Sequence, residues 1–152
     1  MARRPFRLQA LLDHKRQLEE QRMLHLAECE AEWRQACEVL AMLRDAERDQ
    51  LRDLEQIARA SRLDVAQQRD ATSYLQRLEV SMRAQGEVIA DAERRVLESR
   101  DALVEILKEK RSLERLREQH VAETEREEGR REAGVVDEIT SARYVRLLQG
   151  RA

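Results

Sequence analysis

Three histidines and two cysteines are the side chains of this chain best suited to metal binding or nucleophilic chemistry. His14, His25 and His120 are isolated from one another, and none belongs to an HExxH motif. Cys29 and Cys37 are eight residues apart, which is about 12 Å along a helix. That separation is too long for a disulfide and matches no zinc-binding spacing. We expect no metal site and interpret both cysteines as small buried residues, with a redox role as the alternative.

Acidic and basic residues are the other groups able to do chemistry, and charged residues make up 39% of the chain. Carboxylates acquire catalytic pKa values in desolvated clefts. The chain has no nucleophile elbow, P-loop or dinucleotide-binding fingerprint that would build such a cleft. Its charges are instead typical of solvated helix faces with weak i,i+3 and i,i+4 pairs. We therefore expect neither an enzyme nor a bound cofactor.

The first half of the chain lacks the residues that interrupt helices. No glycine or proline occurs from Phe6 to Gln85, and the segment is rich in Leu, Ala, Glu, Arg and Gln, which predicts a long helix. Aromatic residues are only 3% of the chain, whereas compact cores use them as fillers. A long charged helix of this kind must pair with another helix to bury its apolar side chains.

The second half carries a heptad repeat. A 3-4 spacing passes through twelve positions, of which nine are apolar: Leu75, Leu78, Met82, Gln85, Ile89, Ala92, Val96, Ser99, Leu103, Ile106, Lys110 and Leu113. This spacing predicts a coiled-coil seam, and its polar members are expected to fix the register at a cost in stability. Gly86 lies inside the run and indicates a soft point or a place of close approach.

A less regular seam is predicted in the first half, with seven of nine positions apolar: Cys29, Trp33, Ala36, Leu40, Leu43, Glu47, Gln50, Leu54 and Ile57. Leu8, Leu11 and Leu18 are expected to belong to a seam as well. Joining them to Cys29 requires a change of phase near Leu26, which we interpret as a stutter in the supercoil.

Two seams in one short chain predict an all-α fold, a long antiparallel two-helix coiled coil or helical hairpin. Both patterns lapse at about residues 58–69, where the turn is expected. Ser61 and Asp64 are candidate helix caps, and Asp64 has capping-box spacing to Gln67. The alternative is one unbroken helix that dimerises.

The whole chain is expected to be one hairpin, with helix one at about 6–58 and helix two at about 70–128. Residues 125–134 are dense in charge and contain two glycines, so this segment is expected to fray or bend. A charged flexible tail follows at about 129–152. The apolar residues of this tail are Val135, Val136, Ile139, Val145, Leu147 and Leu148. A short tail with such residues is typical of a docking element, and the alternative is a frayed terminus.

Charge is unevenly distributed along the chain. The net charge is −2 and the pI is about 6.0, which does not favour nucleic-acid binding. Residues 1–22 carry six basic and three acidic side chains (+3), and residues 139–152 carry three basic side chains and none acidic (+3), so residues 23–138 hold −8. The acidic body argues against a helix bound to nucleic acid or to a membrane surface.

No run of about 18 apolar residues occurs, so we expect no membrane insertion and a cytoplasmic protein.

Two segments resemble the FliJ family, the small coiled-coil component of the flagellar type III export ATPase complex. The first is FRLQALLDHKRQLEEQ at Phe6–Gln21, and the second is the charged segment KEKRSLERLREQHVAETEREEGRREAGVVDEITSARY at Lys108–Tyr144. The resemblance implies an antiparallel two-helix coiled coil similar to the gamma-subunit stalk of the F-type ATP synthase. It implies a non-enzymatic protein of flagellar biogenesis, chemotaxis and motility, at the cytoplasmic face of the inner membrane.

The resemblance also implies partners and a monomer when free. Both chain ends would lie in the pore of the hexameric export ATPase, and the region toward the turn would contact the cytoplasmic domain of the export gate. The family also binds export chaperones. The alternatives are the equivalent stalk of a virulence secretion system and a homodimeric scaffold.

Two sets of site residues follow from the resemblance and from the charge of the ends. The gate-binding set is Leu43, Ala46, Gln50, Tyr74, Leu78, Ser81 and Gln85. The ATPase-ring set is Arg3, Arg4, Arg7, Lys15, Arg16, Arg143 and Arg146. Leu43, Leu78 and Gln50 also lie on the seam, where core packing explains them equally well. Tyr74 lies one step off the seam and is the better candidate for an exposed contact.

Overall fold

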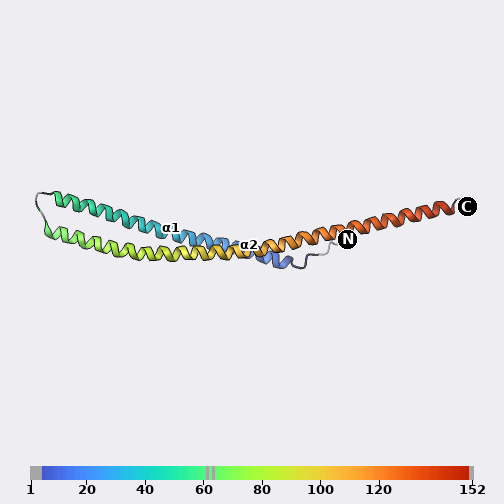
Figure 1. Ribbon diagram of the computed structural model, residues 1–152, viewed down its shortest axis with the longest axis horizontal. Helices are drawn as coiled ribbons and strands as arrows, with labels where there is room; N and C mark the ends of the chain where they lie inside the picture. The colour runs from blue at the N-terminus through green and yellow to red at the C-terminus, as the bar shows by residue number, and fades with distance from the viewer. Residues whose placement is uncertain (1–4, 61, 63, 151–152) are drawn as a thin grey trace. The chain divides into compact units, whose positions relative to one another are not determined.

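The computed structural model describes residues 5–60, 62 and 64–150. Two helices, α1 (Gln9–Arg59) and α2 (Val65–Gln149), account for nearly all of them, and no strand occurs in these residues (Figure 1). The chain divides into two compact units: unit 1 is Met1–Leu18 with Ile106–Ala152, and unit 2 is Glu19–Glu105. A part of α1 packs against a part of α2 in each unit, which confirms the predicted all-α helical hairpin.

The helices of unit 2 are antiparallel. The side-chain amide of Gln85 donates to the backbone oxygen of Ala36 at 2.8 Å. Further from the turn, Arg95 pairs with Glu32 and Arg100 with Glu30, each at 2.8 Å. Residue numbers therefore fall along α1 as they rise along α2.

Burial follows the predicted seam. All twelve α2 positions of the heptad repeat are buried or half-buried. The first-half positions are buried or half-buried too, except Trp33, which is 37% exposed. The buried residues among those described are Leu12, Cys29, Ala36, Ala71, Leu78, Ala92, Val96, Ser99 and Leu113. Several are alanine, and small side chains allow two helix backbones to approach closely.

The structure differs from the prediction as to which leucines at the start of α1 belong to the seam. Leu12 is completely buried, whereas Leu11 is 42% exposed. At the start of α1 the seam therefore contains Leu12, whereas the sequence predicted Leu11. A 3-4 spacing connects Leu12, Lys15, Glu19, Arg22 and Leu26, of which Lys15, Glu19 and Leu26 are half-buried and Arg22 is exposed. Polar side chains hold the seam positions between the two leucines, which hid the repeat from a search for apolar residues. The boundary between the two units falls in this polar stretch.

The turn between the helices is short and is closed by one aspartate. α1 ends at Arg59, where the amide of Ala60 donates to the carbonyl of Ile57. One carboxylate oxygen of Asp64 accepts from the amides of Ala66 (3.0 Å) and Gln67 (3.2 Å). Asp64 is thus the predicted N-cap of α2, whereas Ser61 lies outside the described residues.

The sequence predicted that the second helix ends near residue 128, but α2 continues well beyond this point. It begins at Val65 and continues through Gly129 and Gly134 to Gln149. Each glycine costs about 1 kcal/mol relative to alanine, but the residues around them are mostly strong helix formers. Every described residue from 129 onward is exposed, so this part of α2 is helical without a partner among the described residues.

Replacing Asp64 with alanine should lower the free energy of unfolding by about 1 kcal/mol, because two amides at the start of α2 lose their acceptor. Asp64→Asn keeps an acceptor oxygen and serves as the control. The measurement is urea denaturation followed by circular dichroism. Equal stability of the alanine and asparagine variants would contradict this role for Asp64.

Replacing Ser99 with alanine should raise stability by about 1 kcal/mol. Ser99 is 5% exposed, and its hydroxyl oxygen is buried without a hydrogen-bond partner, which is costly. Ser112→Ala is the matched control, because the exposed Ser112 hydroxyl donates to the carbonyl of Lys108 at 3.1 Å. Thermal melting of both variants tests this, and a loss of stability in Ser99→Ala would show that the hydroxyl has a partner in solution.

Candidate docking surfaces

The predicted gate-binding residues all lie in unit 2, but most of them serve the seam. Leu78 is buried, and Leu43, Gln50 and Gln85 are half-buried. The side-chain amide of Gln85 donates a hydrogen bond to the backbone carbonyl of Ala36, which the small alanine side chain leaves accessible. These four residues are placed to hold the helices together, and their replacement would disturb the fold as well as any docking.

The remaining three predicted gate-binding residues form a distinct edge beside the seam. Tyr74 is 38% exposed, Ser81 is exposed and Ala46 is half-buried. They occupy equivalent heptad positions on the two helices, on the same side of the seam as the Glu32–Arg95 pair. We call this side the Tyr74 edge. The guanidinium of Arg77 lies 5.9 Å from the centre of the Tyr74 ring, a cation–π distance.

A shallow groove of about 470 Å³ opens on the Tyr74 edge near the turn. It is lined by Tyr74 and Gln50 from the predicted set and by Ile57 on its apolar side. Asp53 and Asp70 also line it, and sequence reasoning missed both. Heptad position could have indicated Asp53, which flanks the seam at a position equivalent to that of Tyr74, whereas Asp70 lies further from the seam on the same side. The groove is therefore partly apolar and partly acidic.

The predicted ATPase-ring residues differ in how free their charges are. Lys15 pairs with Glu109, and Arg16 lies 3.7 Å from Asp13 and 3.8 Å from Glu114. Arg7, Arg143 and Arg146 are exposed and make no ion pair with a described residue. Arg3 and Arg4 lie outside the described residues. The cations available to a partner are thus Arg7, Arg143 and Arg146, whereas Lys15 and Arg16 join α1 to α2 within unit 1.

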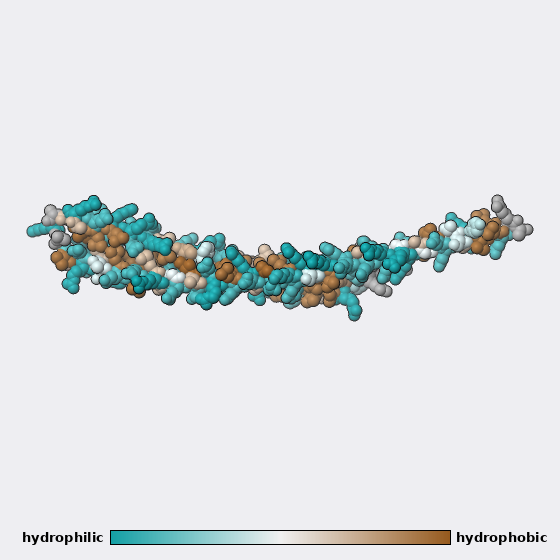
Figure 2. Space-filling view, viewed as in Figure 1, coloured by the Kyte–Doolittle hydropathy of each residue, from teal (hydrophilic) through white to brown (hydrophobic). Residues whose placement is uncertain are grey.

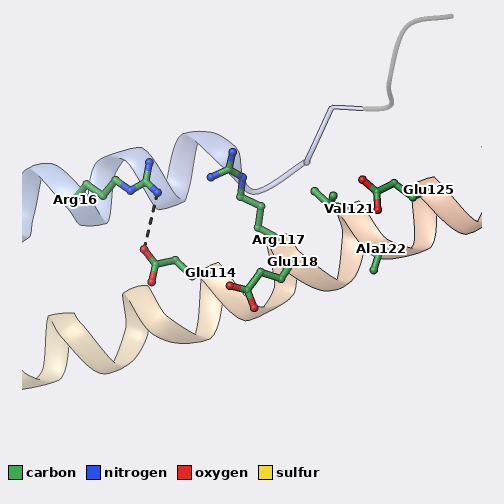
Figure 3. A pocket seen from close by; sticks show the side chains of 7 residues that line it. All are labelled: Arg16, Glu114, Arg117, Glu118, Val121, Ala122 and Glu125. Carbon is green, nitrogen blue, oxygen red and sulfur yellow. Dashed lines mark ion pairs between the residues drawn. The ribbon is translucent and has the colours of Figure 1, made fainter.

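Figure 3 shows a second groove, of about 500 Å³, in unit 1. The Arg16–Glu114 pair closes one end of it, and Val121 and Glu125 lie toward the other. Four charged side chains lie toward the end with the ion pair, and two small apolar side chains and Glu125 lie toward the other end of this open surface. Such a surface suits contact with another protein, because small-molecule sites are enclosed and mostly apolar.

The last part of α2 presents apolar side chains to solvent. Seven large apolar or aromatic residues there are at least half exposed: Val135, Val136, Ile139, Tyr144, Val145, Leu147 and Leu148. Figure 2 shows brown, apolar surface at separate places near the C-terminal end of α2, with paler residues between them. Arg143 and Arg146 lie on the same segment. The sequence indicated this apolar character, but it did not indicate that the segment is a continuation of α2.

The histidines and cysteines form no metal centre in the described part of the chain, where no cluster of three or more potential ligands occurs. Cys29 is buried on the seam with its sulfur 3.7 Å from the ring of His25, and Cys37 is half-buried. The ring of His120 lies 5.7 Å from that of Phe6. Neither helix, within the described residues, has a segment long and apolar enough to cross a membrane.

A family model described as the flagellar FliJ protein matches residues 4–148 of the 152-residue chain. No curated protein and no solved structure matches the chain significantly. The match spans both helices and almost the whole sequence, so the chain belongs to the FliJ family of flagellar proteins.

Proposed function

We propose that this protein is a non-enzymatic component of the flagellar type III export apparatus. In this proposal it is a stalk inserted in the hexameric export ATPase, which it couples to the cytoplasmic domain of the export gate, and it binds export chaperones. It acts as a monomer in the cytoplasm, at the cytoplasmic face of the inner membrane. Family membership supports the export theme.

The observation that carries the ATPase part of the proposal is the exposed final segment of α2. From residue 129 onward this helix has no partner among the described residues, yet it carries seven exposed large apolar or aromatic side chains. A helix that presents apolar side chains to water is the usual form of a docking element. Arg143 and Arg146 add two free positive charges, which would attract an acidic ring surface.

The Tyr74 edge supports the gate part of the proposal. Tyr74 is an exposed aromatic residue beside a partly acidic groove, and aromatic residues dominate the binding energy of many interfaces. Unit 2 also holds the turn, the region that would face the gate. The equivalent stalk of a virulence secretion system would have the same architecture, but the flagellar family match favours the flagellar system.

Reversing the charge of Arg143 and Arg146 together should weaken binding to the export ATPase about tenfold at low salt, which corresponds to about 1.4 kcal/mol. The loss should shrink at high ionic strength, because salt screens exposed charges. The measurement is calorimetric titration with the purified ATPase. The control is the same reversal at Arg48 and Arg52 of unit 2, which are also exposed. Unchanged affinity of the Arg143/Arg146 variant at low salt would refute the electrostatic part of the proposal.

Replacing Tyr74 with alanine should weaken binding to the cytoplasmic domain of the gate protein about tenfold, because an exposed aromatic anchor is lost. Helix content should not change, since Tyr74 lies beside the seam and not in it. Val80→Ala is the control, because Val80 is 68% exposed and its heptad position points away from the seam. Equal losses in the two variants, measured by surface plasmon resonance, would argue against a specific gate contact at Tyr74.

A further inference from the structure

The seam of unit 2 has a second edge that none of the surfaces above uses. In an antiparallel pair of helices, the positions flanking the seam face their equivalents on the partner helix, one set on each side. The ion pair between Glu30 and Arg100 spans the two helices on one side, and the pair between Glu32 and Arg95 spans them on the other. The Tyr74 edge is the side of Glu32. We call the side of Glu30 the Gly86 edge, because Gly86 occupies an equivalent flanking position there.

Neither the backbone conformation nor a close contact with a described residue requires glycine at position 86. No described glycine has a positive φ, so the backbone at Gly86 does not need glycine. A β-carbon built at Gly86 would meet no atom within 4 Å, so no neighbour in the chain excludes a side chain. Glycine nevertheless destabilises a helix interior by about 1 kcal/mol relative to alanine. The space above Gly86 is therefore open to something outside the chain.

Gly86 lies in an open groove of about 600 Å³ between the two helices. Leu40 of α1 and Met82 of α2 provide apolar surface beside it. Both belong to the seam and are half-buried, so part of each side chain faces the groove. A glycine between two apolar side chains makes a surface on which another backbone can lie closely.

The charged lining of this groove is predominantly basic, with three arginines (Arg44, Arg48 and Arg83) and two glutamates (Glu47 and Glu79). Arg83 pairs with Glu79 at 2.6 Å, and Arg48 pairs with Asp45. Arg44 makes no ion pair with a described residue. For a partner that covers the groove, a carboxylate placed near Arg44 would therefore contribute most to the binding affinity.

The same edge continues as a second, smaller groove about three helical turns from Gly86. It is lined by Trp33 and Leu97, which are 37% and 53% exposed, and by Val96. Its charges balance, because Arg34 and Arg100 accompany Glu30 and Glu93. This part of the edge therefore offers apolar surface without a preference for either charge. A helix of about 20 residues, about 30 Å long, would cover both grooves.

We propose that the Gly86 edge of unit 2 docks an amphipathic helix of a partner protein. The apolar face of that helix lies on Met82 and Leu40 and crosses closely over Gly86, and its end reaches Trp33. An acidic side chain beside that apolar face pairs with Arg44. Docking would complete a three-helix arrangement, with the partner helix covering the seam from the side. The surface is distinct from those assigned to the ATPase and the gate.

The experiment uses the full chain and a synthetic acidic helical peptide of about 21 residues as the probe. The peptide has leucines at i, i+4, i+7 and i+11, glutamates beside them and no tryptophan. A second peptide has lysines in place of the glutamates. Trp33 is the single tryptophan of the chain, so its fluorescence reports occupation of the edge directly. We expect the acidic peptide to shift the Trp33 emission and the basic peptide to have no effect.

Gly86→Leu is the decisive variant. Leucine fills the groove and favours helix more than glycine does, so the variant should melt no lower than the natural chain while its peptide affinity falls at least tenfold. Gly129→Leu is the matched control, because a β-carbon at Gly129 also meets no atom within 4 Å and Gly129 lies in unit 1. Its peptide affinity should be unchanged.

Four results would overturn the proposal. The first is the absence of binding by the acidic peptide, and the second is equal binding of both peptides. The third is unchanged affinity of Gly86→Leu. A dimer in light scattering that Gly86→Leu converts to a monomer would also overturn it, because the occupant would then be a second copy of this chain. None of these outcomes depends on binding to the ATPase or to the gate, so they do not bear on the export function.

Discussion

Packing of two helices along one heptad seam is the constraint on which both units depend. The residues that are buried in the described part of the chain, eight apolar side chains and Ser99, all lie at seam positions. A charged helix with a narrow apolar stripe gains little by folding alone, since tertiary packing supplies most of the stability of helices in proteins. Each unit forms because segments of α1 and α2 cover each other's stripe.

The narrow seam also decides where function can reside. Two paired helices enclose no deep cavity, and the grooves of the described residues are open and lined by a mixture of charged and apolar side chains. Surfaces of this type recognise other proteins. Seam positions hold the helices together, whereas flanking positions remain free to vary and to bind. Tyr74, Gly86 and the final segment of α2 are all outside the seam, which separates the docking surfaces from the residues that maintain the fold.

Polar residues within the seam have different consequences according to their surroundings. Gln85 reaches a backbone carbonyl across the helix pair, which is possible because Ala36 is small, and this bond specifies how the helices align. The hydroxyl of Ser99 is buried without a hydrogen-bond partner, which lowers the stability of the fold. Lys15 and Glu19 hold seam positions near the boundary between the two units. Polar seam positions thus specify the register of the helices at Gln85 and lower the stability of the fold at Ser99.

The sequence by itself determined the fold class, the seam of α2 and the cap at Asp64, because heptad spacing and capping chemistry are local properties of the chain. It also indicated family membership, which the match over residues 4–148 confirms. The sequence misjudged the phase at Leu12 and the end of α2. The reason is that polar residues can occupy a seam, and that a helix can pass through Gly129 and Gly134 when its neighbours favour helix.

Only the tertiary structure decided which predicted site residues are free. Leu43, Leu78 and Gln85 are occupied by packing or hydrogen bonding, and Lys15 and Arg16 by ion pairs between the helices. Tyr74, Arg143 and Arg146 remain exposed. The open space above Gly86 also depends on the partner helix, because a groove needs two walls. A sequence gives the spacing of side chains along each helix, whereas their exposure depends on what the other helix places opposite them.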